Sequence, residues 1–197
     1  MSQEFFDLSS TERKRFDDGN YVYDLHNRGN RLIIHIRSMH SMCRKAKPIK
    51  ISIPDTIDYY IDLSKCFYNH GQLVDISALS TFDTSRVVKI EEMFSRCHKL
   101  ASIEPLSNWD VSNVWNMTGT FNTCSKLTDL TCLSNWKVSD DCILEAFYSI
   151  CSPYLIPTGH IIRLDGLGIR YDQASIDKYL QAHFPQWLID RHNARGY

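Results

Sequence analysis

The sequence predicts an α/β solenoid, a leucine-rich-repeat-like stack of short helices and parallel strands with an N-terminal hairpin cap and a C-terminal helical cap. Two observations predict this fold: a 27-residue repeat, and a helix-spaced apolar pattern followed by closely spaced leucines within each repeat. "FDTSRVVKIEEMFSRCHKLASIEPLSN", residues 82–108, is followed directly by "WDVSNVWNMTGTFNTCSKLTDLTCLSN", residues 109–135. Repeats of this kind bury their apolar faces against neighbouring units.

Apolar residues recur at equivalent positions of successive repeat units. The clearest sets are Phe82, Trp109 and Trp136; Leu79, Leu106 and Leu133; Cys97, Cys124 and Cys151; and Phe67, Phe94, Phe121 and Tyr148. We expect these side chains to lie beside one another in the core. The recurring cysteines are then small packed side chains rather than redox centres.

Residues 1–48 are predicted to form the N-terminal cap. Ser9 and Glu12 have capping-box spacing, which favours a helix over residues 3–16. Apolar and polar residues then alternate in "YVYDL" and "LIIHI", on either side of a turn rich in Gly and Asn. This pattern predicts a β-hairpin over residues 21–36.

Residues 49–158 are predicted to hold the repeat units. One set of apolar residues has the i, i+3, i+7, i+10 spacing of a short helix: Val114, Met117, Phe121 and Cys124. Ser112 stands where its N-cap would be. A second set is assigned to a short strand with its return turn: Leu127, Leu130 and Leu133. Each unit is therefore expected to consist of a helix, a strand and a turn.

Residues 159–197 are predicted to form a C-terminal helical cap. The segment "DQASIDKYLQAHF" has the apolar periodicity of an amphipathic helix, and Pro185 directly follows it.

The repeat resembles a known family. "FDTSRVVKIEEMF..C" and "WDVSNVWNMTGTF..C..L", together with "IKISIPDTIDYY" at residues 49–60, are similar to the leucine-rich-like repeats of the BspA type, in particular the branch found in mycoplasma lipoproteins. The resemblance covers residues 49–158. It implies a non-enzymatic adhesion or interaction protein, and implies nothing more specific about molecular function.

Composition and charge limit the classes of function. Apolar residues make up 43% and charged residues 23% of the chain, as in ordinary folded domains, and no apolar run is long enough to span a membrane. The start has no secretory signal or lipid-attachment cysteine, so we expect a cytoplasmic protein with reduced thiols. Residues 1–50 hold ten Lys and Arg against six Asp and Glu, whereas residues 51–158 hold seven against thirteen.

No motif in the sequence predicts an enzyme, a metal site or a cofactor. Cys66 and His70 have the spacing of half a zinc site, but no second pair at ligand spacing follows. No phosphate-binding glycine loop is present, and no local signature brings a nucleophile to a base.

The outward residues of the predicted strands are the favoured binding site. If Ile76, Ile103 and Leu130 point inward, their neighbours point outward. These neighbours, the predicted partner-binding residues, are Asp75, Ser77, Ser102, Glu104, Asp129 and Thr131. Three carboxylates without a positive charge predict recognition of a basic protein surface.

An intracellular, compact binding module of this kind is consistent with an inhibitor or effector from a phage or another mobile element. An exposed strand edge at either end would also support a homo-oligomer.

A nucleic-acid-associated protein is the alternative. The segment "CRKAKPIK" carries Arg44, Lys45, Lys47 and Lys50, which suit phosphate contacts. The acidic repeat units disfavour this alternative because their field repels a duplex.

Overall fold

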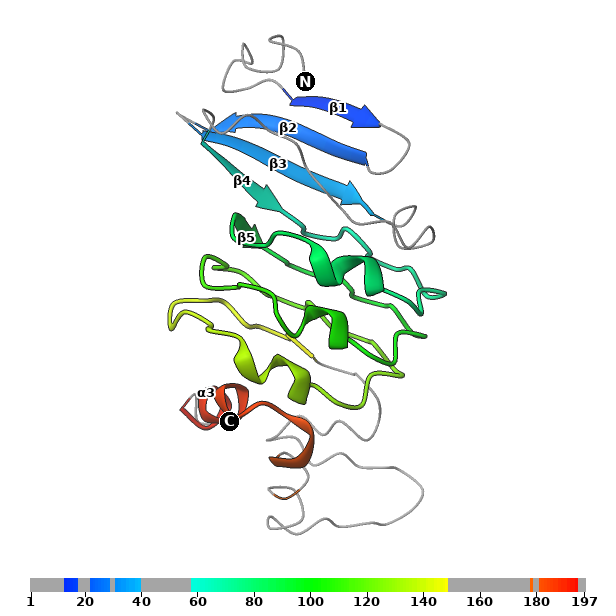
Figure 1. The fold of residues 1–197 in the computed structure, drawn as a ribbon, viewed down its shortest axis with the longest axis vertical. Coiled ribbons are helices and arrows are strands. Elements are labelled where there is room, and N and C mark those ends of the chain that lie inside the picture. Colours follow the sequence, from blue (N-terminus) through cyan, green and yellow to red (C-terminus); the bar gives the residue numbers. More distant parts are fainter. Residues whose placement is uncertain are drawn as a thin grey trace.

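The computed structural model describes residues 13–17, 22–28, 31–39, 58–148, 178 and 181–194. Its strands are β1 (Arg13–Asp17), β2 (Val22–Arg28), β3 (Arg31–Ser38), β4 (Tyr59–Asp62) and β5 (Val87–Lys89). Its helices include the 3-10 helices η2 (Ser77–Thr81), η3 (Glu104–Leu106) and η4 (Thr131–Asn135) and the α-helix α3 (Gln186–Ala194). Along the long axis of the molecule the sheet lies at one end and α3 near the other (Figure 1).

The strands form one five-stranded mixed sheet in the order β1-β2-β3-β4-β5. β1, β2 and β3 pair antiparallel, so the expected hairpin is formed by β2 and β3, whereas β4 and β5 continue the sheet in parallel. Leu32, Ile34 and Ile36 alternate along β3 and are buried, as the two-residue period of a strand requires. The helix predicted over residues 3–16 is wrong for residues 13–16, which lie in β1; residues 3–12 lie outside the described part.

The predicted α/β solenoid of short helices and parallel strands is wrong. The named strands belong to the mixed sheet, and the segments predicted as helices contain turns instead of α-helix. Beyond β5, parallel strand pairing continues in the described units only as isolated bridges, Lys89 to Asn116 and Asn116 to Ile143. The predicted strand segments contain the 3-10 helices η2, η3 and η4.

Left-handed residues and bonds between units explain why the helix-spaced segments do not form helices. Gly119 and Thr123 have φ values of 62° and 61°, and the equivalent Glu92 and Arg96 have 51° and 64°. An α-helix needs negative φ throughout. Moreover, the Gly119 N–H donates to Glu145 O at 2.8 Å, in the next unit, rather than to a residue four positions earlier.

The leucines predicted as a strand are spaced by three residues, and this spacing explains the 3-10 helices. Side chains at i and i+3 lie on the same side of a 3-10 helix, whereas a strand alternates every two residues. Leu130 directly precedes η4 and Leu133 lies in its middle, and both are fully buried. The period of three was therefore the relevant signal.

The 27-residue period itself describes how the units meet. The same backbone bond recurs every 27 residues, as in Phe67 N–H to Met93 O and Phe94 N–H to Thr120 O, both 2.9 Å. The rings of Phe67, Phe94 and Phe121 are stacked nearly parallel, with centroids 5.2 and 5.7 Å apart. The core positions that recur in the sequence are thus buried beside one another among the described residues.

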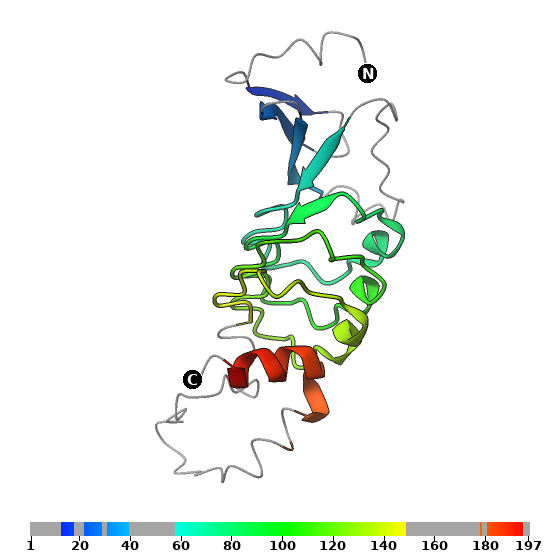
Figure 2. The same cartoon turned by 90° about the vertical axis from the view of Figure 1, so that its left-hand side faces the viewer.

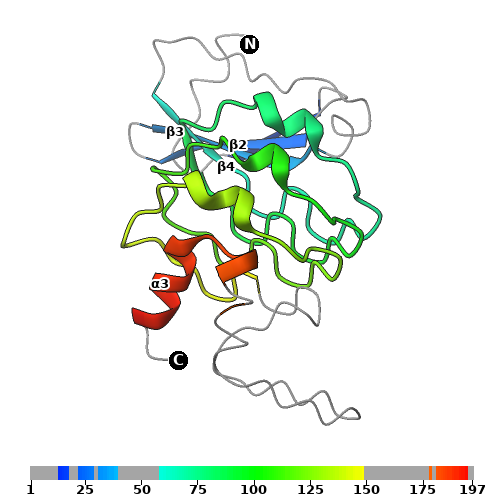
Figure 3. The same ribbon diagram turned by 60° about the horizontal axis from the view of Figure 1, so that its bottom comes forward.

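The C-terminal part contains one helix that the sequence did not predict. Residues 178 and 181–183 are helical, in agreement with the predicted amphipathic helix, and Pro185 follows. α3 then begins directly at Gln186. Leu188 on α3 and Phe184 just before it are buried and belong to the hydrophobic core. Figure 3 shows α3 beside the repeat units. Within the described ranges no helix has the length and apolarity needed to cross a membrane.

Candidate partner-binding face

The helices η2, η3 and η4 lie in a row along one side of the repeat units (Figure 2). Each follows a buried residue, Ile76, Ile103 or Leu130, and places a buried leucine in the core. The remaining residues of these segments are directed mostly toward solvent. We define the 3-10 face as the exposed and half-buried residues of segments 74–81, 101–108 and 128–135.

Short polar side chains begin each 3-10 helix. The Ser77 N–H donates to Asp75 Oδ1 at 2.8 Å, and the Thr131 N–H donates to Asp129 Oδ1 at 2.7 Å. In η3, Ser102 Oγ accepts the Glu104 N–H at 3.3 Å. Side chains that bond the backbone two residues later favour turns over strands. Half of the predicted binding residues therefore also shape the backbone of the face.

The other predicted residues lie beside these capping side chains. Ser77 and Glu104 are exposed at the first positions of η2 and η3. The Thr131 hydroxyl donates to Asp129 Oδ1 at 2.6 Å. The six predicted partner-binding residues thus lie at the first position of a 3-10 helix or two residues before it, on one side of the repeat units, rather than on strands.

The 3-10 face is acidic. Its three segments contain Asp75, Glu104 and Asp129 and no Lys, Arg or His. Among the described residues none of these carboxylates has an ion-pair partner within 4.0 Å. Burial raises the pKa of Cys132, and the charges of Glu104 and Asp129 raise it further, to about 11. The thiol therefore lies in the negative field of carboxylates from two units.

Two further carboxylates, which the sequence analysis did not select, lie directly after the 3-10 helices. A hydrogen bond from the Ser85 hydroxyl lowers the pKa of Asp83, and one from the Ser112 hydroxyl lowers that of Asp110. Both carboxyl groups remain ionised at neutral pH. The Asp-x-Ser spacing, shared with Asp75 and Ser77, was the signal that would have identified them.

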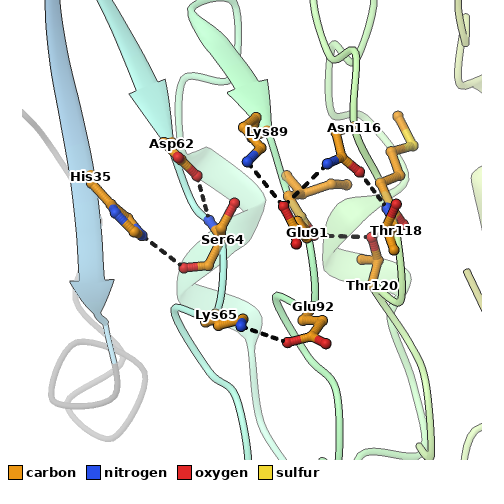
Figure 4. A network of polar contacts seen from close by, with 12 residues as sticks. His35, Asp62, Ser64, Lys65, Lys89, Glu91, Glu92, Asn116, Thr118 and Thr120 are labelled. Atoms are coloured by element: carbon orange, nitrogen blue, oxygen red, sulfur yellow. Dashed lines mark hydrogen bonds and ion pairs between the residues drawn. The ribbon is translucent and has the colours of Figure 1, made fainter. Parts of the chain in front are cut away.

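The end of β5 and the segments that follow β4 and β5 carry a polar surface of a different kind (Figure 4). There Glu91 lies 2.9 Å from Lys89, and Glu92 lies 3.1 Å from Lys65. Asn116 also donates to Glu91, at 3.1 Å. The two glutamates of this surface are matched by cations, in contrast to the carboxylates of the 3-10 face.

The cysteine and histidine candidates do not form a reactive group in the described part of the chain. Cys66 is fully buried, and the described residues contain no group of three His, Cys, Asp or Glu able to hold a metal ion. The Cys97 thiol donates to Phe67 O at 3.2 Å, and burial raises its pKa to about 12. Such a thiol is not a nucleophile at neutral pH.

Some predicted residues lie outside the part of the chain that the structure describes. Arg44, Lys45, Lys47, Lys50 and Cys151 all lie outside the described residues.

The described repeat units share one core and carry an acidic face on one side. The family comparison agrees with the repeat: residues 34–153 match the family model described as "Mycoplasma protein of unknown function, DUF285". The chain belongs to this family. Searches of curated proteins and of solved structures give no match.

Proposed function

We propose that this protein is a non-enzymatic, BspA-like interaction module that binds a basic protein surface through its 3-10 face. The observation that carries the proposal is the separation of charge. Asp75, Glu104 and Asp129 stand together without a cation on the 3-10 face, whereas Glu91 and Glu92, which follow β5, are ion-paired.

Unpaired surface carboxylates attract a partner of opposite charge over a longer range than paired ones. Such complementarity accelerates encounter and selects among partners more than it adds affinity. Since the carboxylates are exposed, the attraction is screened by salt. Binding through this face is therefore expected to weaken as ionic strength rises.

The test removes the charges and keeps the hydrogen-bond acceptors. In the variant Asp75→Asn/Glu104→Gln/Asp129→Asn, the two asparagines still offer an oxygen to the Ser77 and Thr131 N–H groups. A matched control, Asp58→Asn/Asp141→Asn/Glu145→Gln, removes three exposed carboxylates elsewhere. Each chain is immobilised and exposed to a lysate of the natural host, and the captured protein is identified, purified and titrated.

We expect the partner to bind wild type and control alike, and to bind the face variant about tenfold more weakly. Three exposed charge contacts of about 0.5 kcal/mol each give this factor. Equal affinity for all three chains, or affinity independent of salt, would show that the 3-10 face is not the binding site. Capture of nucleic acid without protein would instead favour the basic segment that contains Arg44, Lys45, Lys47 and Lys50.

A further inference from the structure

Tryptophan side chains join successive repeat units through one recurring hydrogen bond. Trp109 Nε1–H donates to Leu79 O at 3.0 Å, and Trp136 Nε1–H donates to Leu106 O at 2.9 Å. The two donors, Trp109 and Trp136, are 27 residues apart, and so are the two acceptors, Leu79 and Leu106. In each case the indole of one unit satisfies the carbonyl of the 3-10 helix in the preceding unit.

The next acceptor in this series is Leu133 O, and it receives an indole from a different element. Position 163, which follows Trp136 by 27 residues, is an arginine. Instead, Trp187 Nε1–H, on α3, donates to Leu133 O at 2.9 Å. A residue 54 positions away thus makes the contact that the next repeat unit would have made.

A second contact between two repeat units has a counterpart on α3. Within the repeat units, Asn113 Nδ2–H donates to Ser85 O at 2.9 Å. The equivalent acceptor in the last described unit is Ser139 O, which receives Arg191 Nη2–H at 2.6 Å. Trp187 and Arg191 are four residues apart, so they lie on one face of α3.

Apolar contacts hold the same face of α3 against the last described unit. The rings of Phe147 and Trp187 meet edge to face at 6.2 Å, close to the 6.1 Å between Phe82 and Trp109 within the units. Leu188 is only 4% exposed. The preceding turn contributes as well, because the Leu130 N–H donates to His183 O at 2.8 Å.

We infer that the end of the last described unit is a docking surface for a helix that carries Trp and Arg four residues apart, and that α3 is its built-in occupant. The carbonyls of Leu133 and Ser139 select the two side chains, and Phe147 receives the indole ring. α3 thereby replaces a further repeat unit by reproducing its side-chain donors on a different backbone. This inference is independent of the proposed binding to a basic partner.

The chain carries its own control for the first test, since its four tryptophans occupy different environments. Trp109, Trp136 and Trp187 donate indole hydrogen bonds, whereas Trp115 is 49% exposed. Hydrogen exchange of the four Nε1–H groups is measured by NMR on the full chain. Exchange at Trp187 is expected to be about tenfold or more slower than at Trp115, as for a bond that opens only by local unfolding. Equal rates at Trp187 and Trp115 would overturn the inference.

A substitution then tests whether Arg191 and Trp187 act together. Arg191→Gln is expected to speed exchange at Trp187 severalfold and to leave Trp109 unchanged, because α3 loses its second donor. Gln186→Ala is the matched control, since Gln186 is exposed on the same helix and its side chain donates to Asp190 of that helix at 2.7 Å. Equal exchange at Trp187 in both variants and in the wild type would show that Arg191 does not hold the helix in place.

The second test supplies the helix in trans. A peptide of residues 181–194 is titrated into the full-length Trp187→Ala/Arg191→Ala variant. Saturable binding that is lost when the peptide carries Ala at the Trp position supports the docking surface. Failure to bind, while Trp109 and Trp136 keep slow exchange, would overturn it. If Trp109 and Trp136 exchange quickly in the double variant, its repeat units are not folded. The peptide is then titrated into the Arg191→Gln variant, where binding supports the docking surface and failure to bind overturns it.

Discussion

A single buried hydroxyl illustrates how polar groups are accommodated between the units. Thr120 is fully buried, and its Oγ1 lies 3.0 Å from Ile90 O in the preceding unit and 2.7 Å from Met117 O. The equivalent positions, Met93 and Phe147, are apolar. The hydroxyl therefore provides a hydrogen-bond donor to backbone carbonyls at this one repeat position. The repeat pattern does not predict it, because the equivalent residues are apolar.

Replacing this hydroxyl is expected to destabilise the protein. Thr120→Val keeps the shape of the side chain and removes the donor, so the free energy of unfolding should fall by about 1–2 kcal/mol. Thr118→Val, at a half-buried position in the same segment, is the control, with an expected change below about 0.5 kcal/mol. Urea unfolding with an unchanged m-value measures both. Equal effects of the two variants would contradict the assigned role of Thr120.

At the scale of elements, burial was predicted correctly from the apolar spacing, whereas local conformation was not. Val114, Met117, Phe121 and Cys124 are buried as their spacing predicted. The same spacing fits a series of turns, and the sequence offers no strong sign of this because left-handed φ values fall on Lys65, Glu92 and Ala146 as well as on a glycine. Bonds to the neighbouring unit stabilise those turns, and such bonds cannot be read from one segment.

Short sequence patterns indicate where the 3-10 helices begin. Asp-x-Ser, Asp-x-Thr and Ser-x-Glu at residues 75–77, 129–131 and 102–104 are side chain to backbone turn patterns. They coincide with the candidate binding residues, which lie on or just before 3-10 helices rather than on the predicted strands. A residue such as Asp129 is consequently expected to affect both stability and binding, by separable routes.

Two substitutions at Asp129 separate these routes. Asp129→Ala removes the acceptor for the Thr131 N–H and should lower the free energy of unfolding by about 0.5–2 kcal/mol. Asp129→Asn keeps an acceptor and should retain near wild-type stability while removing the charge. Thermal unfolding followed by circular dichroism compares them. If both variants lose the same stability, the charge rather than the hydrogen bond stabilises η4.

At the scale of the whole molecule, the repeat period was the most informative feature of the sequence. It identified the aromatic, leucine and cysteine positions that meet between units, because those contacts depend on spacing alone. It did not identify the mixed sheet, whose strands β4 and β5 continue the hairpin in parallel. Nor did it identify α3, since Trp187 lies outside the 27-residue register of the tryptophans that it imitates.

Contacts between units are expected to make the described core unfold as one cooperative structure. Phe94 stacks on both Phe67 and Phe121, whereas Phe82 contacts one ring, that of Trp109. Phe94→Ala should therefore cost about 3–5 kcal/mol, through lost packing and the cavity left behind, and more than Phe82→Ala.

Circular dichroism and tryptophan fluorescence are followed together during urea unfolding of both variants. Fluorescence reports mainly on units after Phe94, because Trp109 and Trp136 lie there. A common midpoint for the two signals is expected, since backbone bonds and rings couple each unit to the next. If the fluorescence midpoint stayed at its wild-type value while circular dichroism shifted in Phe94→Ala, the units would unfold independently. The bonds between them would then contribute little to holding the acidic face in one piece.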